Sequence, residues 1–227
     1  MKICFLGTGS FPTANRNSQG ILLQSKDTSV LVDCGEGIQR QLLKSGIEYK
    51  NLKHIFITHE HMDHIDGITG LLALLIYQGQ IDQVHIYGPS DAIKVIQAKI
   101  DSCRPIISKD SYHLHTAQAS KPIIISEMII IPFDTYHTNT SLGYVLMAEN
   151  KKIMCTGDIE LKWLEHKPDL GRIDKLIVDG AHVGMKTLTT YLNTYENLEV
   201  YLLPVNYHNS QNDIRFRIPN DLDIIEF

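Results

Sequence analysis

Six short apolar runs in this chain end abruptly in a histidine or an aspartate, and this pattern restricts the fold more than any other feature. The residues that end these runs are Asp33, His59, His137, Asp158, Asp179 and His208. In α/β proteins, strand ends and the loops after them carry the chemistry. Ligand-type side chains on separate strand ends can meet only if the sheets bring those ends to one edge, which is the geometry of a metal site.

Strand-like and helix-like segments alternate along the chain, with a β-rich stretch in the middle. Hydrophobic patterning predicts strands over residues 3–6, 21–24, 29–32, 55–58, 84–87, 111–115, 121–127, 128–133, 142–147, 152–155, 175–178, 199–203 and 223–226. It predicts helices over residues 37–45, 65–77, 91–100 and 187–194. Two groups of strands with helices between them favour an α/β fold of two face-to-face sheets covered by helices. No linker interrupts the sequence, so we expect one domain over residues 1–227.

Composition and charge exclude several classes of protein. The 21 Lys and Arg residues against 26 Asp and Glu give a net charge of −5, whereas a protein that holds nucleic acid by bulk charge should be basic. The longest apolar run, residues 68–77, is far shorter than the roughly 20 residues that cross a bilayer. The first residues lack a signal-peptide pattern, and the four cysteines form no C-x-x-C pair. We therefore expect a cytoplasmic protein with reduced cysteines and no membrane partner.

The sharpest motif lies at residues 59–64, which read H-E-H-M-D-H between a predicted buried strand and a predicted helix. Histidines two positions apart on a looped segment can face one ion, and the following Asp-His pair can face a second ion. Imidazole and carboxylate ligands suit zinc or a similar divalent metal, and a site without thiolates keeps room for water. A polar surface loop is the alternative, but the apolar and periodic flanks indicate that core elements hold this loop on both sides.

This motif resembles the signature of the metallo-β-lactamase superfamily, and its surroundings are similar to ribonuclease Z, the endonuclease that trims tRNA 3′ ends. The matching segments are FLGTGS at 5–10, PT at 12–13, RN at 16–17, DCGEG at 33–37, QRQLL at 39–43, IFITH at 55–59, IYGP at 86–89 and LGY at 142–144. The similarity is dense over residues 2–90, looser to about residue 158 and thin afterwards. The resemblance implies the superfamily's αββα four-layer sandwich.

The resemblance also implies a set of metal ligands. They are His59, His61 and His137 for one metal, Asp63, His64 and His208 for the other, and Asp158 as the bridge. His182 competes with His208 for the last position, or supports the ligands from behind. The family uses the carboxylate at Asp33 to orient a ligand, as a metal-bound imidazole requires. Asp63 is expected to orient the attacking water or to accept its proton.

Two departures from the ribonuclease Z pattern bear on the substrate. Asp158 follows His137 by 21 positions, which leaves room for a hairpin where the tRNA-processing enzymes insert a long arm that grips tRNA. The family's H-E-A-T and G-H-S-T segments supply a glutamate and a protonating histidine. In this chain they are replaced by D-G-A-H at 179–182 and M-K-T-L at 185–188. His182 and Lys186 are then the candidates for protonating the leaving group.

We therefore expect a metal-dependent phosphodiesterase with two zinc ions, or manganese in their place. Its expected reaction is hydrolysis of a phosphodiester at an RNA 3′ end by a hydroxide that bridges the metals. The alternative is a small-molecule phosphodiesterase that acts on cyclic nucleotides, which the missing arm and the acidic net charge favour. Hydrolysis of a thioester or lactone, and a metal site without catalysis, are further alternatives. The resemblance also implies a homodimer, because related proteins dimerise through neighbouring helices.

Overall fold

The computed structural model describes residues 1–10, 15–77, 82–104, 106–166, 171–193, 195, 198–204 and 216–227. Within these residues the strands form two seven-stranded sheets. The first sheet contains, in spatial order, β14 (Ile224–Glu226), β1 (Lys2–Gly7), β2 (Gly20–Ser25), β3 (Thr28–Val32), β4 (Leu52–Phe56), β5 (Val84–Gly88) and β6 (Tyr112–Thr116). The second contains β13 (Phe216–Arg217), β12 (Glu199–Leu203), β11 (Lys175–Asp179), β10 (Lys151–Cys155), β9 (Leu142–Ala148), β8 (Met128–Asp134) and β7 (Ile123–Ile125).

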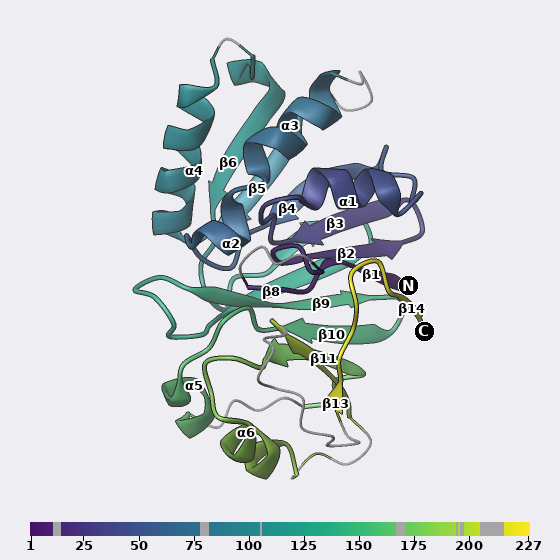
Figure 1. The fold of residues 1–227 in the computed structure, drawn as a ribbon, viewed down its shortest axis with the longest axis vertical. Helices are drawn as coiled ribbons and strands as arrows, with labels where there is room; N and C mark the ends of the chain where they lie inside the picture. The colour runs from purple at the N-terminus through teal and green to yellow at the C-terminus, as the bar shows by residue number, and fades with distance from the viewer. Residues whose placement is uncertain are drawn as a thin grey trace.

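Helices lie on the outer side of each sheet (Figure 1). The helices beside the first sheet are α1 (Ile38–Lys44), α2 (Met62–Ile65), α3 (Ile68–Tyr77) and α4 (Ser90–Ser102). Those beside the second sheet are α5 (Leu161–Glu165) and α6 (Met185–Leu192), and a short 3₁₀ helix, Lys109–Ser111, precedes β6. No helix in the described part of the chain has the length and apolarity to cross a membrane.

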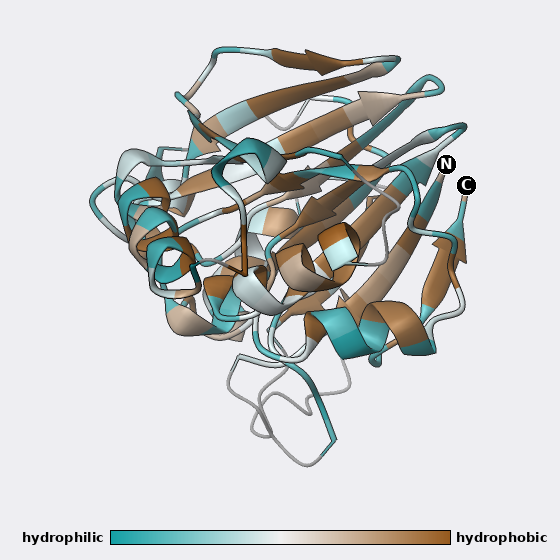
Figure 2. Cartoon of the chain, turned by 90° about the horizontal axis from the view of Figure 1, so that it is seen from above, coloured by the Kyte–Doolittle hydropathy of each residue, from teal (hydrophilic) through white to brown (hydrophobic). Residues whose placement is uncertain are grey.

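Three apolar clusters fill the spaces between the layers, and the strands are mainly hydrophobic (Figure 2). Between the sheets, the ring of Phe56 meets that of Tyr144 edge-on at a centroid distance of 5.3 Å. Leu71 of α3 is buried outside the first sheet, and Trp163 of α5 outside the second. Both faces of each sheet are therefore covered, which explains the nearly continuous apolar runs in the sequence. The expected αββα sandwich is confirmed.

The helix predicted over residues 65–77 begins later than expected. The structure starts α3 at Ile68, and a separate short helix, α2, covers Met62–Ile65 before it. The N–H of Gly67 donates a hydrogen bond to the carbonyl of Cys34 (2.9 Å), and a Cβ at Gly67 would lie 2.1 Å from the carbonyl oxygen of Gly35. The loop after β3 thus packs directly onto the backbone between the helices. The short elements α5 and β13 were not predicted.

The interval between His137 and Asp158 holds a tight hairpin. Strands β9 and β10 pair antiparallel, with Ala148 opposite Lys151. The two residues that join them, Glu149 and Asn150, have φ angles of 53° and 58°, as a two-residue hairpin turn requires. The predicted hairpin is confirmed, and no extended arm leaves this part of the fold.

The C-terminal segment closes over the N-terminal loop. Strand β14 pairs antiparallel with β1, with Ile225 opposite Ile3. Just before β14, the carboxylate of Asp221 accepts hydrogen bonds from the backbone N–H and hydroxyl of Thr8 and from the backbone N–H of Asn17. The loop after β1 and the approach to β2 are therefore held by residues from the far end of the sequence.

Four histidines outside the motif line up across one face of the first sheet. In the strand register, His54 of β4 lies beside His85 of β5, which lies beside His113 of β6. Their ring centroids are 5.2 and 5.0 Å apart, and His85 Nδ1 is 3.1 Å from Nε2 of His115. No sequence pattern groups these residues, because the contacts depend on the pairing of three parallel strands.

These four histidines, which we call the histidine ladder, predict a contribution to stability that is lost in acid. Burial, with the neighbouring His85, lowers the pKa of His54 to about 4, below the usual histidine value of about 6.5. The unfolded chain therefore binds more protons at this position between those pH values, so stability is lost as the pH falls through that window. A His54→Phe variant keeps the aromatic contact without the titration. We expect its melting temperature to fall less than that of the wild type between pH 7 and pH 5.

Differential scanning calorimetry at several pH values provides the measurement. The matched control is His166→Phe, because His166 also contacts an aromatic ring, that of Tyr136, but lies outside the ladder. If His54→Phe and the wild type lose the same melting temperature on acidification, His54 does not carry this pH dependence.

Candidate metal centre

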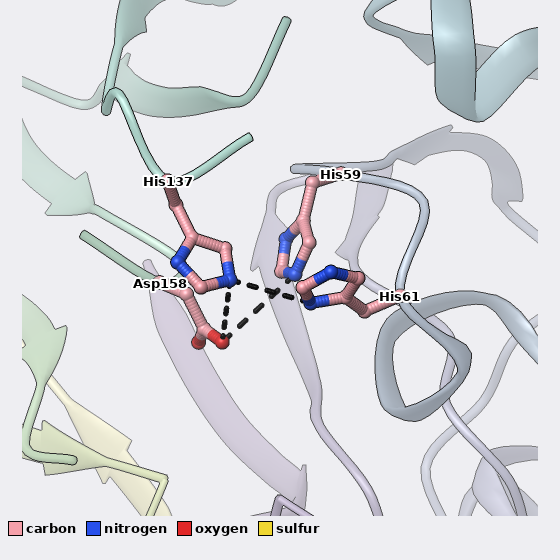
Figure 3. Close-up of side chains that lie close together, drawn as sticks. All are labelled: His59, His61, His137 and Asp158. Atoms are coloured by element: carbon pink, nitrogen blue, oxygen red, sulfur yellow. Dashed lines mark hydrogen bonds and ion pairs between the residues drawn. The ribbon is translucent and has the colours of Figure 1, made fainter. Parts of the chain in front are cut away.

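The ligand-type residues of the sequence motif meet at one edge of the sandwich. His59 follows the end of β4, His61 is the N-cap of α2, and His137 and Asp158 lie in the loops after β8 and β10. Figure 3 shows these four side chains pointing toward one another. The two strand ends of the second sheet therefore face the motif that follows β4 in the first sheet.

One ligand atom from each of His59, His61, His137 and Asp158 lies within 4.8 Å of the others, and we call this group the first position. Nε2 of His137 is 3.3 Å from Nδ1 of His61 and 3.6 Å from Oδ2 of Asp158, which also lies 3.9 Å from Nε2 of His59. Ligand atoms that share a tetrahedral zinc at about 2.0 Å are roughly 3.3 Å apart. The spacing of the first position is close to that of ligands around one ion.

The state of His59 indicates that the first position is built for a cation. Its Nε2 is buried and finds no hydrogen-bond partner among the described residues. Burial, together with nearby His64, holds the pKa of His59 well below its usual range, so the ring is neutral and carries a free lone pair. An unsatisfied buried nitrogen costs free energy, and a neutral imidazole is the form that binds metal. Three imidazoles with one carboxylate fit zinc.

A second group, Asp63, His64 and Asp158, lies beside the first, and we call it the second position. Nε2 of His64 is 3.5 Å from Oδ1 of Asp158 and 3.7 Å from Oδ2 of Asp63. Asp158 thus turns one oxygen to each position, as a bridging carboxylate does. The two positions together contain six of the seven predicted ligands. The seventh, His208, lies outside the described residues.

The buried carboxylate of Asp33 holds the His64 ring in place through the ring nitrogen that faces away from the second position. Its Oδ1 accepts the backbone N–H of Thr58 at 2.8 Å, and its Oδ2 lies 2.8 Å from Nδ1 of His64. Burial alone would lower the pKa of His64, but Asp33 and Asp158 outweigh it and hold this pKa well above its usual range. Burial would likewise raise the pKa of Asp158, but His64 lowers it. The Asp33 contact directs the other ring nitrogen of His64 into the site, as a ligand-orienting carboxylate does.

His182 lies at the rim of the first position. Its Nε2 is 3.6 Å from Oδ2 of Asp158, and its Nδ1 is 2.8 Å from Oδ2 of Asp179. The hydrogen bond to Asp179 is the main cause that raises the pKa of His182 to about 9. His182 therefore approaches the Asp158 oxygen that faces His59 and His137, rather than the oxygen that faces His64. The other sequence candidate for proton donor, Lys186, lines a separate groove of about 440 Å³ between α5 and α6.

A cavity of about 600 Å³ opens over both positions. Among the described residues, it is lined by Ser10, His61, Met62, Asp63, Asp158, Ala181 and His182. A cavity of this size is typical of small-molecule sites. Three candidate ligands, His61, Asp63 and Asp158, and His182 thus line the cavity, whereas His59 and His64 are fully buried.

One buried residue of the site was missed by the sequence analysis. The amide nitrogen of Gln19 lies 3.2 Å from Nε2 of His64 and 3.3 Å from Oδ1 of Asp158. Gln19 belongs to no metal-binding motif and precedes the first residue of β2. No local signal could have found it, because its position depends on β2 starting beside α2.

The Asp33 contact predicts a defect in metal binding for Asp33→Asn. An asparagine amide would donate a hydrogen bond to Nδ1 of His64 and thereby leave the ring proton on Nε2, where the free lone pair is needed. We expect metal affinity at the second position to fall about 10- to 100-fold. Titration of the metal-free protein with zinc against a competing chelator measures this change.

The matched control is Asp66→Asn, because Asp66 pairs with Lys99 at 2.7 Å outside the site. This variant should bind zinc as the wild type does. Unchanged zinc binding in Asp33→Asn, with the control also unchanged, would show that Asp33 does not orient a ligand.

Comparison with known proteins places this chain in a family. A family model described as anti-Pycsar protein Apyc1 matches residues 1–178. A ribonuclease Z from Picrophilus torridus is 45% identical over 160 residues, which cover 67% of this chain and 49% of that protein. A ribonuclease Z from Methanococcus maripaludis is 32% identical over 197 residues, 85% of this chain and 62% of that protein. The chain thus spans less than two thirds of the length of these relatives.

Solved structures share the fold. The short form of human tRNase Z superposes with a TM-score of 0.79 at 22% identity, over 100% of this chain and 99% of that one. The metallo-β-lactamase fold protein YhfI from Bacillus subtilis gives 0.77 at 20% identity, over 99% and 98%. At these identities the likeness concerns the fold. The chain belongs to the anti-Pycsar protein Apyc1 family and is a ribonuclease Z-like member of the metallo-β-lactamase superfamily.

Proposed function

We propose that this chain is a metal-dependent phosphodiesterase. The observation that carries the proposal is the placement of Asp158, which turns Oδ2 toward His59 and His137 and Oδ1 toward His64. A shared carboxylate between two ligand groups is the arrangement expected of a two-metal hydrolase. We propose zinc for the first position because its donors are three imidazoles and one carboxylate, with manganese as the alternative.

Two divalent cations at these positions would activate water at neutral pH and stabilise negative charge on a phosphate. The chain supplies the groups that handle protons. Burial raises the pKa of Asp63, which lines the cavity and is placed to orient the water or to accept its proton. On the opposite side of Asp158, His182 carries a proton on Nε2 at neutral pH because Asp179 binds its Nδ1. We propose His182 as the group that protonates the leaving oxygen.

We further propose that the substrate is a nucleotide-sized phosphodiester, such as a cyclic nucleotide. The tight hairpin of β9 and β10 occupies the interval where ribonuclease Z enzymes carry the tRNA-gripping arm. The cavity of about 600 Å³ matches a ligand of this size, and the net charge of −5 gives no bulk attraction for RNA. Cleavage of RNA 3′ ends is the second candidate, favoured by the identity to ribonucleases Z.

The activity test uses purified protein loaded with zinc or manganese. We expect hydrolysis of bis(p-nitrophenyl) phosphate and of 3′,5′- or 2′,3′-cyclic nucleotides, and little cleavage of precursor tRNA. Asp158→Ala should reduce the rate by orders of magnitude, because it removes a donor from both positions. Metal content measured on the same samples connects the loss of rate to the loss of ions.

The matched control is Asp101→Ala, which removes a surface carboxylate that pairs with Arg104. It should retain the wild-type rate. Full activity in Asp158→Ala would contradict the two-metal proposal. Cleavage of precursor tRNA with cyclic nucleotides untouched would instead support RNA as the substrate.

The role of His182 predicts a dependence on the leaving group. In His182→Asn, we expect the rate to fall about 10²- to 10⁴-fold for a cyclic nucleotide, whose ribose oxygen needs a proton as it leaves. Hydrolysis of bis(p-nitrophenyl) phosphate should change little, because nitrophenolate leaves without protonation. The measurement is the ratio of the two rates, together with the metal content of the variant.

His166→Asn is the control, because His166 lies on the surface at the end of α5 and contacts Tyr136. Equal losses on both substrates, accompanied by a loss of bound metal, would identify His182 as a ligand instead of a proton donor.

The homodimer and the cytoplasmic location stay predictions from the sequence.

A further inference from the structure

Gln19 is anchored beside the second position through its backbone. Its N–H donates to the carbonyl of Asp63 at 3.2 Å, and its own carbonyl accepts the N–H of Gly35 at 2.9 Å. The preceding residue, Ser18, lies so close to β1 that a Cβ at Gly7 would fall 1.8 Å from the Ser18 carbonyl oxygen. The side chain is 3% exposed, so Gln19 has a fixed backbone and a buried amide.

The amide group of Gln19 lies against two of the predicted ligands of the second position. Its nitrogen is 3.2 Å from Nε2 of His64 and 3.3 Å from Oδ1 of Asp158, and those two atoms are 3.5 Å apart. The three atoms form a triangle whose sides match the spacing within the first position. Since Asp33 already binds Nδ1 of His64, this triangle uses the ring nitrogen that lies toward Asp158.

We propose that the amide oxygen of Gln19 is a further ligand of the second metal position. A 180° rotation about the last side-chain bond of a glutamine exchanges the positions of its amide nitrogen and amide oxygen. In this structure the amide nitrogen donates a hydrogen bond to Oδ1 of Asp158. With a cation between them, the oxygen occupies the same place as a donor. This inference rests on the proposed metal-dependent function and adds a residue of this chain to it.

The ligand changes the chemical character of the second position. The first position offers three imidazole nitrogens and one carboxylate oxygen, which suits zinc. Among the described residues, the second offers the imidazole of His64 with oxygens from Asp63, Asp158 and Gln19. The predicted ligand His208 would add a second imidazole, and the second position would still hold more oxygen donors than the first. Oxygen-rich sites favour harder cations such as Mn²⁺ relative to imidazole-rich sites. We therefore expect the two positions to differ in metal preference.

The experiment measures binding and needs no substrate. Metal-free protein receives one equivalent of zinc and is then titrated with Mn²⁺, while electron paramagnetic resonance counts the free Mn²⁺. The wild type should bind about one equivalent of Mn²⁺. In Gln19→Leu, we expect the Mn²⁺ dissociation constant to rise about 10- to 100-fold, with the zinc equivalent retained. Gln19→Glu, which restores an oxygen, should bind Mn²⁺ at least as tightly as the wild type.

The matched control is Gln24→Leu, at the other end of β2, where Gln24 bonds to Ser29 and to the Glu48 carbonyl. It should bind both ions as the wild type does. Unchanged Mn²⁺ binding in Gln19→Leu overturns the inference and leaves the metal-dependent function intact. Mn²⁺ binding in Gln19→Glu as weak as in Gln19→Leu also overturns it. A wild type that binds zinc but no second ion overturns it too, and one that binds no metal at all overturns the proposed function as well.

Discussion

The buried carboxylate of Asp33 is the contact on which the metal centre depends. It directly follows β3, adopts a left-handed backbone with a φ angle of 60°, and binds Thr58 in the loop after β4 and His64 in α2. Burying an ionised carboxylate costs several kcal/mol, and hydrogen bonds must offset that cost. The hydrogen bonds of Asp33 therefore hold the strand end before His59 and the helix of His64 in one relative geometry.

Burial and carboxylate partners decide what each histidine of the centre can do. Within the part of the chain that the structure describes, the inward nitrogen of His59 finds no hydrogen-bond partner, and burial keeps the ring neutral, which is the state of a ligand. His182 is bound by Asp179 and keeps its proton, which is the state of an acid. The two rings approach the same oxygen of Asp158, so the same side-chain chemistry serves two purposes within a few ångströms. The difference arises from position alone.

The sequence could predict the layers and most of the centre, because both depend on local patterns. Apolar runs predicted each strand but β13, and H-E-H-M-D-H predicted the candidate ligands that the structure brings together on α2 and the loop before it. The separation of α2 from α3 could not be foreseen, because it comes from the contact of Gly67 with the distant Gly35. Gln19 was missed for the same reason, since its role arises only when β2 begins beside His64.

The pairing of β1 with β14 has a consequence for how the chain assembles during synthesis. Asp221, which fastens the loop after β1 by bonding Thr8, is translated 213 positions after it. An emerging N-terminal half would carry an open β-edge on its first strand, and such edges invite association with other chains. A ribosome-bound nascent chain thus has a complete motif at residues 59–64 long before the segment that leads to Gln19 is fastened in place.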